Sequence, residues 1–293
     1  KMKILMDYYD RPGDAQLTKE AYELLDILVI AHPSEAKSWS IYGDFLGRDL
    51  NYEGSREKFR KALEQDKNVY LIWNQVLILD AQLNDYKSLY AESKTALDLF
   101  PTQAILYYYH GLGAFQTEKY SEAIDALNAG KDLVLDNREL RFEFFQLLGD
   151  SYHKTGDHVN SDKSYEEALK IDPNNVYVLN NYAYYLSVRK VNLDKAAAMS
   201  KTSNELQPDQ STFEDTYAWI LFQQNKYADA EIWMRKALAH GGNNSGTILE
   251  HYGDILYHLN RTDEAVNYWK QAKEKTGTSD IIDRKIRDKK YYE

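Results

Sequence analysis

Apolar residues return along this chain in blocks, and each block has the pattern of two amphipathic helices joined by a short polar turn. The clearest block covers residues 142–175. Its marker positions are Leu148, Gly149, Tyr152, Ser161, Tyr165, Ala168 and Pro173. Gly149 lets a second helix come close, and the small Ser161 and Ala168 lie where that helix crosses. We therefore expect residues 142–175 to form two packed, antiparallel helices.

The same pattern recurs with a period of about 34 residues. Pro33 and Pro101 lie two such periods apart, and Pro173 and Pro208 close two later blocks. The position of Gly149 is taken in the other blocks by Gly43, Leu77, Gly111, Ala183, Ala218 and Gly253. Blocks therefore begin near residues 36, 70, 104, 142, 176, 211 and 246, and the fifth block has one extra residue in its turn at 191–193.

This order of aromatic, small and proline positions resembles the tetratricopeptide-repeat (TPR) family over nearly the whole chain. The resemblance implies an all-α fold, a TPR α-solenoid of antiparallel helix pairs in a right-handed superhelix. It implies about seven repeats within residues 36–279. Residues 280–293 carry Ile281, Ile282 and Ile286 on one helix face and are expected to form a C-terminal capping helix and tail.

Residues 1–35 are expected to hold the second helix of one further, incomplete repeat. Its first helix would have to come from residues 1–13, which are short and contain Pro12 and Gly13. We therefore expect the chain to be part of a longer protein. Any export or lipidation signal would then lie upstream of Lys1.

Composition argues against several other functions. The 293 residues carry a formal net charge of -10, which disfavours binding to nucleic acid or to anionic lipid. The lack of cysteine excludes disulfides, zinc–thiolate sites and a cysteine nucleophile. No apolar run reaches the roughly 20 residues that span a bilayer, so direct membrane insertion of this chain is not expected. No motif in the sequence requires a cofactor.

A narrower resemblance concerns residues 179–186, 215–221 and 251–256. These segments are similar to TPR proteins of Gram-negative, Bacteroidetes-like cell envelopes, which are often outer-membrane lipoproteins that face the periplasm. The resemblance implies an adaptor or scaffold, with an envelope protease or a peptidoglycan hydrolase as its partner. A cytoplasmic location stays open, because any export signal would lie outside these residues.

In TPR arrays the first helix of each pair lines the concave surface, so the outward positions of these helices are candidate partner contacts. In repeats five to seven these positions combine aromatic, amide and carboxylate side chains. The predicted partner-binding residues are Asn180, Asn181, Tyr184, Asp215, Trp219, Phe222, Glu250, Asp254 and Tyr257. Aromatic residues with polar neighbours are typical anchors of protein interfaces. The alternative is that these aromatic residues only fill space between helices.

An enzymatic alternative rests on His251, Asp254 and His258, which share one helix face at spacings compatible with metal ligands. No fourth ligand or general base lies nearby in the sequence, so we predict no catalytic and no metal-binding residue. The glycine-rich stretch 241–246 lacks the ending of a phosphate loop and predicts a turn between repeats. A scaffold is thus favoured over a metal-assisted hydrolase or a purely structural spacer within a larger protein.

Overall fold

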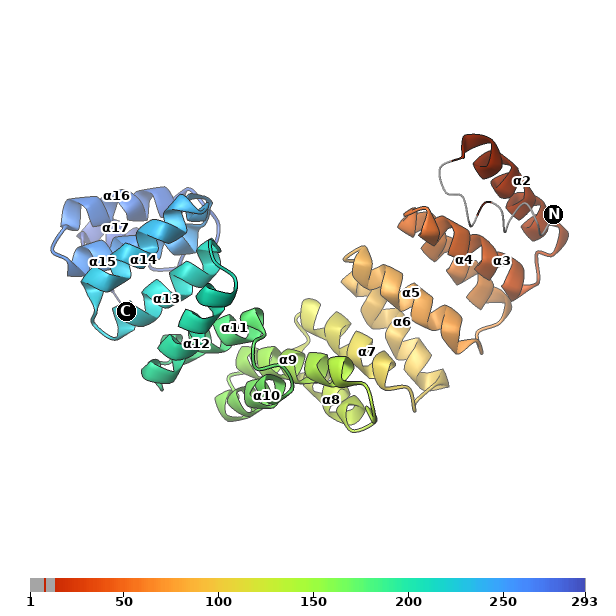
Figure 1. The fold of residues 1–293 in the computed structure, drawn as a ribbon, viewed down its shortest axis with the longest axis horizontal. Coiled ribbons are helices and arrows are strands. Elements are labelled where there is room, and N and C mark those ends of the chain that lie inside the picture. Colours follow the sequence, from red (N-terminus) through yellow and green to blue (C-terminus); the bar gives the residue numbers. More distant parts are fainter. Residues whose placement is uncertain (1–7, 9–13, 293) are drawn as a thin grey trace. The chain divides into compact units, whose positions relative to one another are not determined.

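The protein, seen in a computed structural model, is helical throughout the part that the structure describes, which is Tyr8 and residues 14–292. This part contains sixteen α-helices, one short 3-10 helix and no strand, so the expected all-α fold of helix pairs is confirmed. The expected break at Pro12 and Gly13 lies outside the described residues. The chain divides into two compact units, Lys1–Ser161 and Asp162–Glu293 (Figure 1).

The first unit is a series of short helices joined by tight turns. These helices are α2 (Ala15–Ala31), α3 (Ala36–Arg48), α4 (Tyr52–Gln65), α5 (Tyr70–Gln82), α6 (Tyr86–Leu99), α7 (Ala104–Gln116), α8 (Tyr120–Lys131) and α9 (Arg138–Lys154). The next helix, α10 (His158–Ile171), begins in this unit and ends in the second. In each helix pair the first helix can be compared with the predicted start of its repeat. The first helices α3, α5 and α7 begin at the predicted residues 36, 70 and 104, whereas α9 begins four residues before the predicted residue 142.

The second unit continues the same alternation. Its helices are α11 (Val176–Val188), α12 (Leu193–Leu206), α13 (Ser211–Gln223), α14 (Tyr227–Ala239), the 3-10 helix η1 (Gly242–Asn244), α15 (Gly246–His258), α16 (Thr262–Lys273) and α17 (Ile282–Asp288). Helix α13 packs against both α11 and α15, so these three first helices share one face of the unit (Figure 1). The division into seven repeats and a C-terminal cap stays our interpretation of these bounds.

Close helix contact explains why the first helices carry glycine. A Cβ atom added at Gly111 would lie 2.6 Å from Cγ of Leu127, and one added at Gly253 would lie 2.4 Å from the ring of Trp269. Real Cβ atoms do not approach other heavy atoms so closely, and overpacking of this kind destabilises a protein. The second helix of each of these pairs therefore rests directly on the backbone of the first.

One residue in left-handed conformation makes the turn inside each helix pair. These residues are Leu50, Asn84, Glu118, Gly156, Lys190, Asn225 and Asn260. Glycine and asparagine adopt this conformation readily, whereas Leu50, Glu118 and Lys190 are held in it by the helices on either side. In the fifth repeat, the extra residue expected at 191–193 coincides with a second left-handed residue, Asn192.

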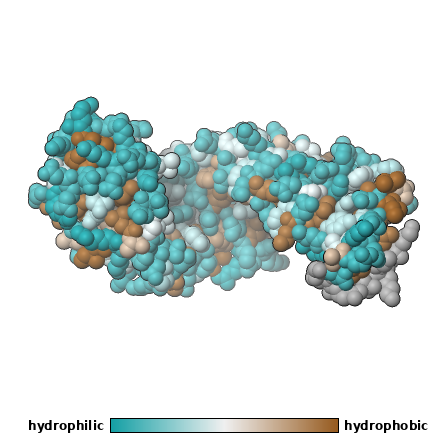
Figure 2. Space-filling model, turned by 90° about the horizontal axis from the view of Figure 1, so that it is seen from above, coloured by the Kyte–Doolittle hydropathy of each residue, from teal (hydrophilic) through white to brown (hydrophobic). Residues whose placement is uncertain are grey.

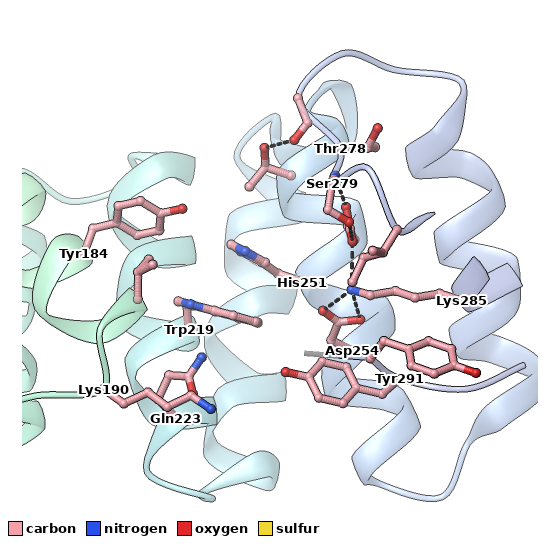
Figure 3. Close-up of a pocket in the computed structure, with 16 residues that line it drawn as sticks. Tyr184, Lys190, Trp219, Gln223, His251, Asp254, Thr278, Ser279, Lys285 and Tyr291 are labelled. Carbon is pink, nitrogen blue, oxygen red and sulfur yellow. Dashed lines mark hydrogen bonds and ion pairs between the residues drawn. The ribbon is translucent and has the colours of Figure 1, made fainter. Parts of the chain in front are cut away.

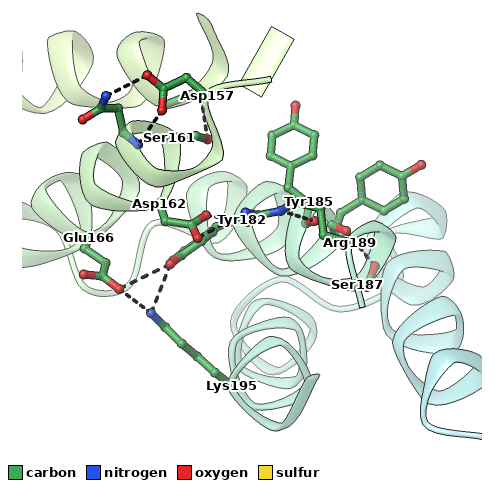
Figure 4. Close-up of polar contacts among 12 residues, drawn as sticks. Asp157, Ser161, Asp162, Glu166, Tyr182, Tyr185, Ser187, Arg189 and Lys195 are labelled. Atoms are coloured by element: carbon green, nitrogen blue, oxygen red, sulfur yellow. Dashed lines mark hydrogen bonds and ion pairs between the residues drawn. The ribbon is translucent and has the colours of Figure 1, made fainter. Parts of the chain in front are cut away.

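Ion pairs join α10, α11 and α12 at the start of the second unit. Arg189 at the end of α11 donates to the carboxylate of Asp162 in α10. Nζ of Lys195 in α12 donates to Oε1 of Glu166 over 2.7 Å, and the Tyr182 hydroxyl also donates to Glu166 (Figure 4). These contacts cross from one repeat to the next and hold α11, which is one of the helices that line the site described below.

The outer surface is mainly polar. Hydrophilic residues dominate the face drawn in Figure 2, and the hydrophobic residues on it are scattered between them. Exposed apolar side chains such as Ile30, Leu135 and Ile232 lie far apart along the chain, in α2, in the loop between α8 and α9, and in α14. None of the described helices combines the length and the apolar character needed to cross a membrane.

Candidate functional site

An open cavity of about 400 Å³ lies in the second unit, against the face formed by α11, α13 and α15. We call this cavity the groove. The lining residues that matter here are Tyr184 from α11, Trp219 and Gln223 from α13, Glu250, His251 and Asp254 from α15, and Lys285 and Tyr291 from the C-terminal segment (Figure 3). The size of the groove falls within the range of protein binding sites for small ligands or individual side chains.

Stacked rings form one wall of the groove. The indole of Trp219 stacks on the imidazole of His251, with ring centroids 3.9 Å apart, and on the ring of Phe222, with centroids 4.7 Å apart. Figure 3 shows Tyr184 on the other side of the groove. Because Trp219 stacks on two other rings, it presents a surface that loses little side-chain entropy when a ligand binds.

His251 is a buried part of this wall. Its Nδ1 lies 2.9 Å from Oδ1 of Asp215, which is also buried. Burial alone would lower the pKa of His251, but the charge and the hydrogen bond of Asp215 outweigh burial and raise this pKa above its ordinary value. This short contact holds the imidazole of His251 in a fixed position against Trp219.

Two carboxylates of α15 meet a single ammonium group at the floor of the groove. Nζ of Lys285 donates to Oε1 of Glu250 at 2.7 Å and to both carboxylate oxygens of Asp254 at 2.8 Å (Figure 3). Nε1 of Trp269 also donates to Asp254, at 2.9 Å, and the backbone N–H of Ser279 donates to Glu250, at 2.8 Å. Glu250, Asp254 and Lys285 are all buried, so each depends on the others for its charge balance.

The two carboxyl groups of this cluster differ in pKa. Burial raises the pKa of Asp254 to about 6, although the nearby Lys285 opposes this shift. Burial also acts on Glu250, but hydrogen bonds from Lys285 and Ser279 outweigh it and lower the pKa of Glu250. Glu250 therefore stays ionised over the physiological range, while Asp254 takes up a proton under mildly acidic conditions.

The structure divides the nine predicted partner-binding residues into two groups. The residues that line the groove are Tyr184, Trp219, Glu250 and Asp254. The residues that do not line it are Asn180, Asn181, Asp215, Phe222 and Tyr257. Their role in binding stays a prediction, but the expected outward position is wrong for Asn180, Asp215 and Phe222, which are all buried. Phe222 has 4 % of its surface exposed because α13 turns it towards Tyr227 and His258.

Glu250 and Asp254 were expected at outward positions as partner contacts, and the structure corrects this position, because both side chains are buried. Glu250 and Asp254 already hold Lys285, which comes from the expected capping helix. Gln223 and Tyr291 also line the groove, and neither was among the predicted residues. The sequence places Lys285 on an amphipathic helix, one residue before Ile286. It does not show where that helix packs, so the contact of Lys285 with the two carboxylates could not be predicted.

The metal-site alternative finds little support in the geometry. His251 and Asp254 are engaged by Asp215 and Lys285, and Nε2 of His258 is buried without a hydrogen-bond partner among the described residues. Within residues 14–292, one group of three potential ligands lies close together, namely Asp209, Glu214 and His240. Both ring nitrogens of His240 already face a carboxylate there, Nδ1 at 2.8 Å from Glu214 and Nε2 at 3.5 Å from Asp209. An ion pair accounts for this grouping.

Comparison with known sequences agrees with the repeat pattern. A family model described as tetratricopeptide repeat matches residues 14–277. A TPR repeat-containing protein of Pseudomonas aeruginosa is 31% identical to this chain over 85 residues. That stretch covers 29% of this chain and 14% of the relative, so the chain spans only a small part of that relative's length.

Solved structures show the same fold. A tetratricopeptide repeat protein from Parabacteroides merdae superposes with a TM-score of 0.66 at 12% identity, covering 87% of this chain and 98% of that one. YrrB, another TPR protein, gives a TM-score of 0.53 at 19% identity, covering 69% of this chain and 97% of that one. With the family model matching most of the sequence, the protein belongs to the tetratricopeptide-repeat family.

Proposed function

We propose that this protein is a scaffold for protein–protein interaction, and that the groove across α11, α13 and α15 holds a segment of its partner. The observation that carries this proposal is the groove itself, which places fixed aromatic rings beside buried charges. Aromatic side chains in a partly desolvated pocket, with polar groups around them, are the usual hot spots of protein interfaces. Tyr184 and Trp219 are the two anchors in this proposal.

The family supports this function. TPR proteins are typically non-catalytic scaffolds. YrrB, which shares the fold, is described as a TPR protein with an unusual peptide-binding site.

The polar residues predicted from the sequence have two roles in this proposal. Asn181 extends the contact surface beside Tyr184, whereas Asp215 positions His251 under Trp219.

The cell envelope is the location that we propose, with an envelope protease or a peptidoglycan hydrolase as the partner. The support is the resemblance of residues 179–186, 215–221 and 251–256 to TPR proteins of Gram-negative envelopes. Fractionation of the source cells, followed by immunoblotting with an antibody against this chain, tests the location. Recovery in the cytoplasmic fraction alone would contradict it.

Photo-crosslinking tests the proposed binding site. A photoreactive phenylalanine analogue replaces Tyr184 in the groove or, as a matched control, Tyr177, an exposed aromatic residue on the same helix that does not line the groove. We expect the Tyr184 probe to capture a defined partner from extract of the source cells, and the Tyr177 probe not to capture it. The substitution Trp219→Ala should weaken capture at least tenfold.

The same experiment separates the scaffold from the spacer. Equal capture by the two probes, or capture that Trp219→Ala leaves unchanged, would place binding elsewhere. Absence of any captured protein would favour a structural spacer. Circular dichroism of each variant shows that the helices are intact, so that a loss of capture is not a loss of folding.

A further inference from the structure

The groove already contains a cation that the chain supplies from its own end. Lys285 belongs to α17, a short helix beyond the last repeat, and its ammonium group is bound by Glu250 and Asp254. Its Nζ also lies 5.4 Å from the ring centroid of Tyr291, within the range of cation–π contact. We call residues 280–292 the latch. The latch thus occupies part of the surface on which a partner would dock.

The latch carries a net positive charge, whereas the rest of the chain carries a net negative charge. It contains five basic residues, Arg284, Lys285, Arg287, Lys289 and Lys290, against the three acidic residues Asp280, Asp283 and Asp288. The whole chain has a net charge of -10. A basic segment seated on an acidic protein through a buried carboxylate pair is a case of charge complementarity.

The attachment of the latch is weak compared with that of the preceding helix. α17 has seven residues and no side-chain hydrogen bond at its N-cap, and Ile282 is its one buried apolar side chain. By contrast α16 buries Ala265, Val266, Trp269 and Ala272. Because isolated helices of this length are unstable in water, α17 depends on its contacts with α16 and with the groove for its structure.

The type of contact that holds the latch allows exchange. A buried ion pair gives little net stability because both groups lose water on burial, whereas losing only one partner is strongly unfavourable. Glu250 and Asp254 therefore require a cation, but they have no strong preference for the one that Lys285 supplies. A lysine or arginine from another protein meets the same requirement.

We propose that the latch is an internal ligand of the groove, and that the partner of this site is a basic peptide segment whose lysine or arginine replaces Lys285 at Glu250 and Asp254. This inference rests on the proposed function of the groove. It adds the chemistry of the partner, a cationic segment with an aromatic residue in the place of Tyr291. It also adds a control step, since the partner binds only as the latch leaves.

A peptide that copies residues 279–292, labelled with fluorescein, is the probe for this proposal. Fluorescence polarisation measures its binding to the full chain, either wild type or Lys285→Met. The wild-type groove is filled from within at an effective concentration of the order of millimolar, so the free peptide should bind weakly. Lys285→Met removes the internal cation, and we expect it to bind the peptide at least tenfold more tightly.

Matched variants show whether the charge is responsible. Lys290→Met removes an exposed lysine of the latch and should leave peptide binding as in the wild type. Glu250→Gln with Asp254→Asn, added to Lys285→Met, should abolish the gain. A peptide with methionine at the position of Lys285 should also fail to bind. The proposal is overturned if folded Lys285→Met binds the peptide no more tightly than wild type, or if the double carboxylate variant keeps the gain.

Hydrogen exchange on the wild-type chain tests the proposal without any substitution. Amides of residues 283–288 should exchange at least tenfold faster than those of residues 263–272, and excess peptide should accelerate exchange in the latch alone. Equal rates in the two helices, together with no response to peptide, would overturn the proposal even if Lys285→Met does not fold.

The partner captured by the Tyr184 probe separates this proposal from the scaffold function. Capture should increase in Lys285→Met and decrease in Glu250→Gln with Asp254→Asn. If the partner is captured equally by all these variants, the latch proposal fails while the scaffold function stands. If the peptide binds as described but Tyr184 captures no protein, the internal ligand stands and the scaffold function fails.

Discussion

Asp80 in the first unit and Asp254 in the second are both buried aspartates of first helices, and their surroundings differ. Asp80 of α5 lies in the first unit and accepts hydrogen bonds from Arg56 at 2.8 Å and Arg60 at 3.1 Å, both from α4. Burial raises the pKa of Asp80 to about 7, Glu92 adds to this shift, and the two arginines oppose it. All these partners come from helices packed inside the array.

Asp254 of α15 lies in the second unit, and its cation comes from outside the array of repeats. Lys285 belongs to the latch, and the groove opens beside the ion pair. Burial raises the pKa of Asp254 as well, to about 6. The two sites thus share a buried carboxylate with a raised pKa, but only at Asp254 is the cation held by a short terminal helix.

The comparison shows that burial and a raised pKa do not by themselves indicate a binding site. At Asp80 the helices that carry the arginines cannot leave without unfolding the repeats. At Asp254 the helix that carries the lysine can leave while the repeats stay folded. The mobility of the partner element, and not the pKa, distinguishes a structural ion pair from an exchangeable one.

The largest expected effect comes from breaking the first of these ion pairs. Asp80→Ala leaves Arg56 and Arg60 facing each other without a carboxylate between them. We expect it to lower the free energy of unfolding by about 3 kcal/mol, measured by urea denaturation. Glu57→Ala, at an exposed position of α4, is the control and should change stability by less than about 0.5 kcal/mol. An Asp80→Ala loss as small as that of the control would show that the network is not structural.

Breaking the second ion pair should cost less. Lys285→Met leaves Glu250 and Asp254 without their cation, but the latch can open and let water reach both carboxylates. We expect a loss of about 1 kcal/mol in the free energy of unfolding, together with faster hydrogen exchange in residues 283–288. A loss equal to that of Asp80→Ala would contradict the difference drawn between the two sites.

The pH dependence should follow the raised pKa of Asp254. Because its folded pKa exceeds the unfolded value of 3.8, the folded state binds more protons between these two values. Asp254 therefore contributes most to stability below pH 4, and this contribution is lost as the pH rises towards 6. One pKa unit corresponds to about 1.4 kcal/mol, so wild type should lose about 2 kcal/mol relative to Asp254→Asn between pH 4 and pH 7. Parallel denaturation curves at several pH values check this, and a constant difference would contradict it.

The smallest expected effect comes from a substitution at the C-terminal end of α17, which should stabilise the latch. Lys289 follows α17 in left-handed conformation, with φ of 49°. Lys289→Gly removes the steric cost of this conformation, offset in part by the greater freedom of glycine when unfolded. We expect the latch to gain about 0.5 kcal/mol, seen as slower exchange in residues 283–288. Glu118→Gly makes the same change at a turn of the first unit, and it should leave exchange in the latch unaltered.

Much of the fold could be predicted because the same pattern of residues recurs in several repeats. A single glycine such as Gly111 is weak evidence, but its recurrence at Gly43, Gly149 and Gly253 identifies the crossing point of these helix pairs. The turns were harder to predict. Leu50 and Glu118 adopt a left-handed conformation that their side chains disfavour, because the packing of two helices overrides local preference.

The candidate site was predicted only in part. Tyr184 and Trp219 could be placed on the groove because helical spacing sets which residues share a face. Phe222 could not, since it lies at the margin of that face, and a small rotation of α13 decides whether it points outward or into the core. Sequence spacing does not fix such a rotation, because it depends on the neighbouring helices.

The sequence by itself determined the class of fold, the repeat period, the positions of close helix contact and the amphipathic helix at the C-terminus. These features depend on local spacing along the chain, which sequence displays directly. The tertiary structure alone decided that Lys285 meets Glu250 and Asp254, 35 and 31 residues earlier in the chain. Such a pairing depends on where the last helix folds back, and a buried charge finds its partner through space and not through sequence.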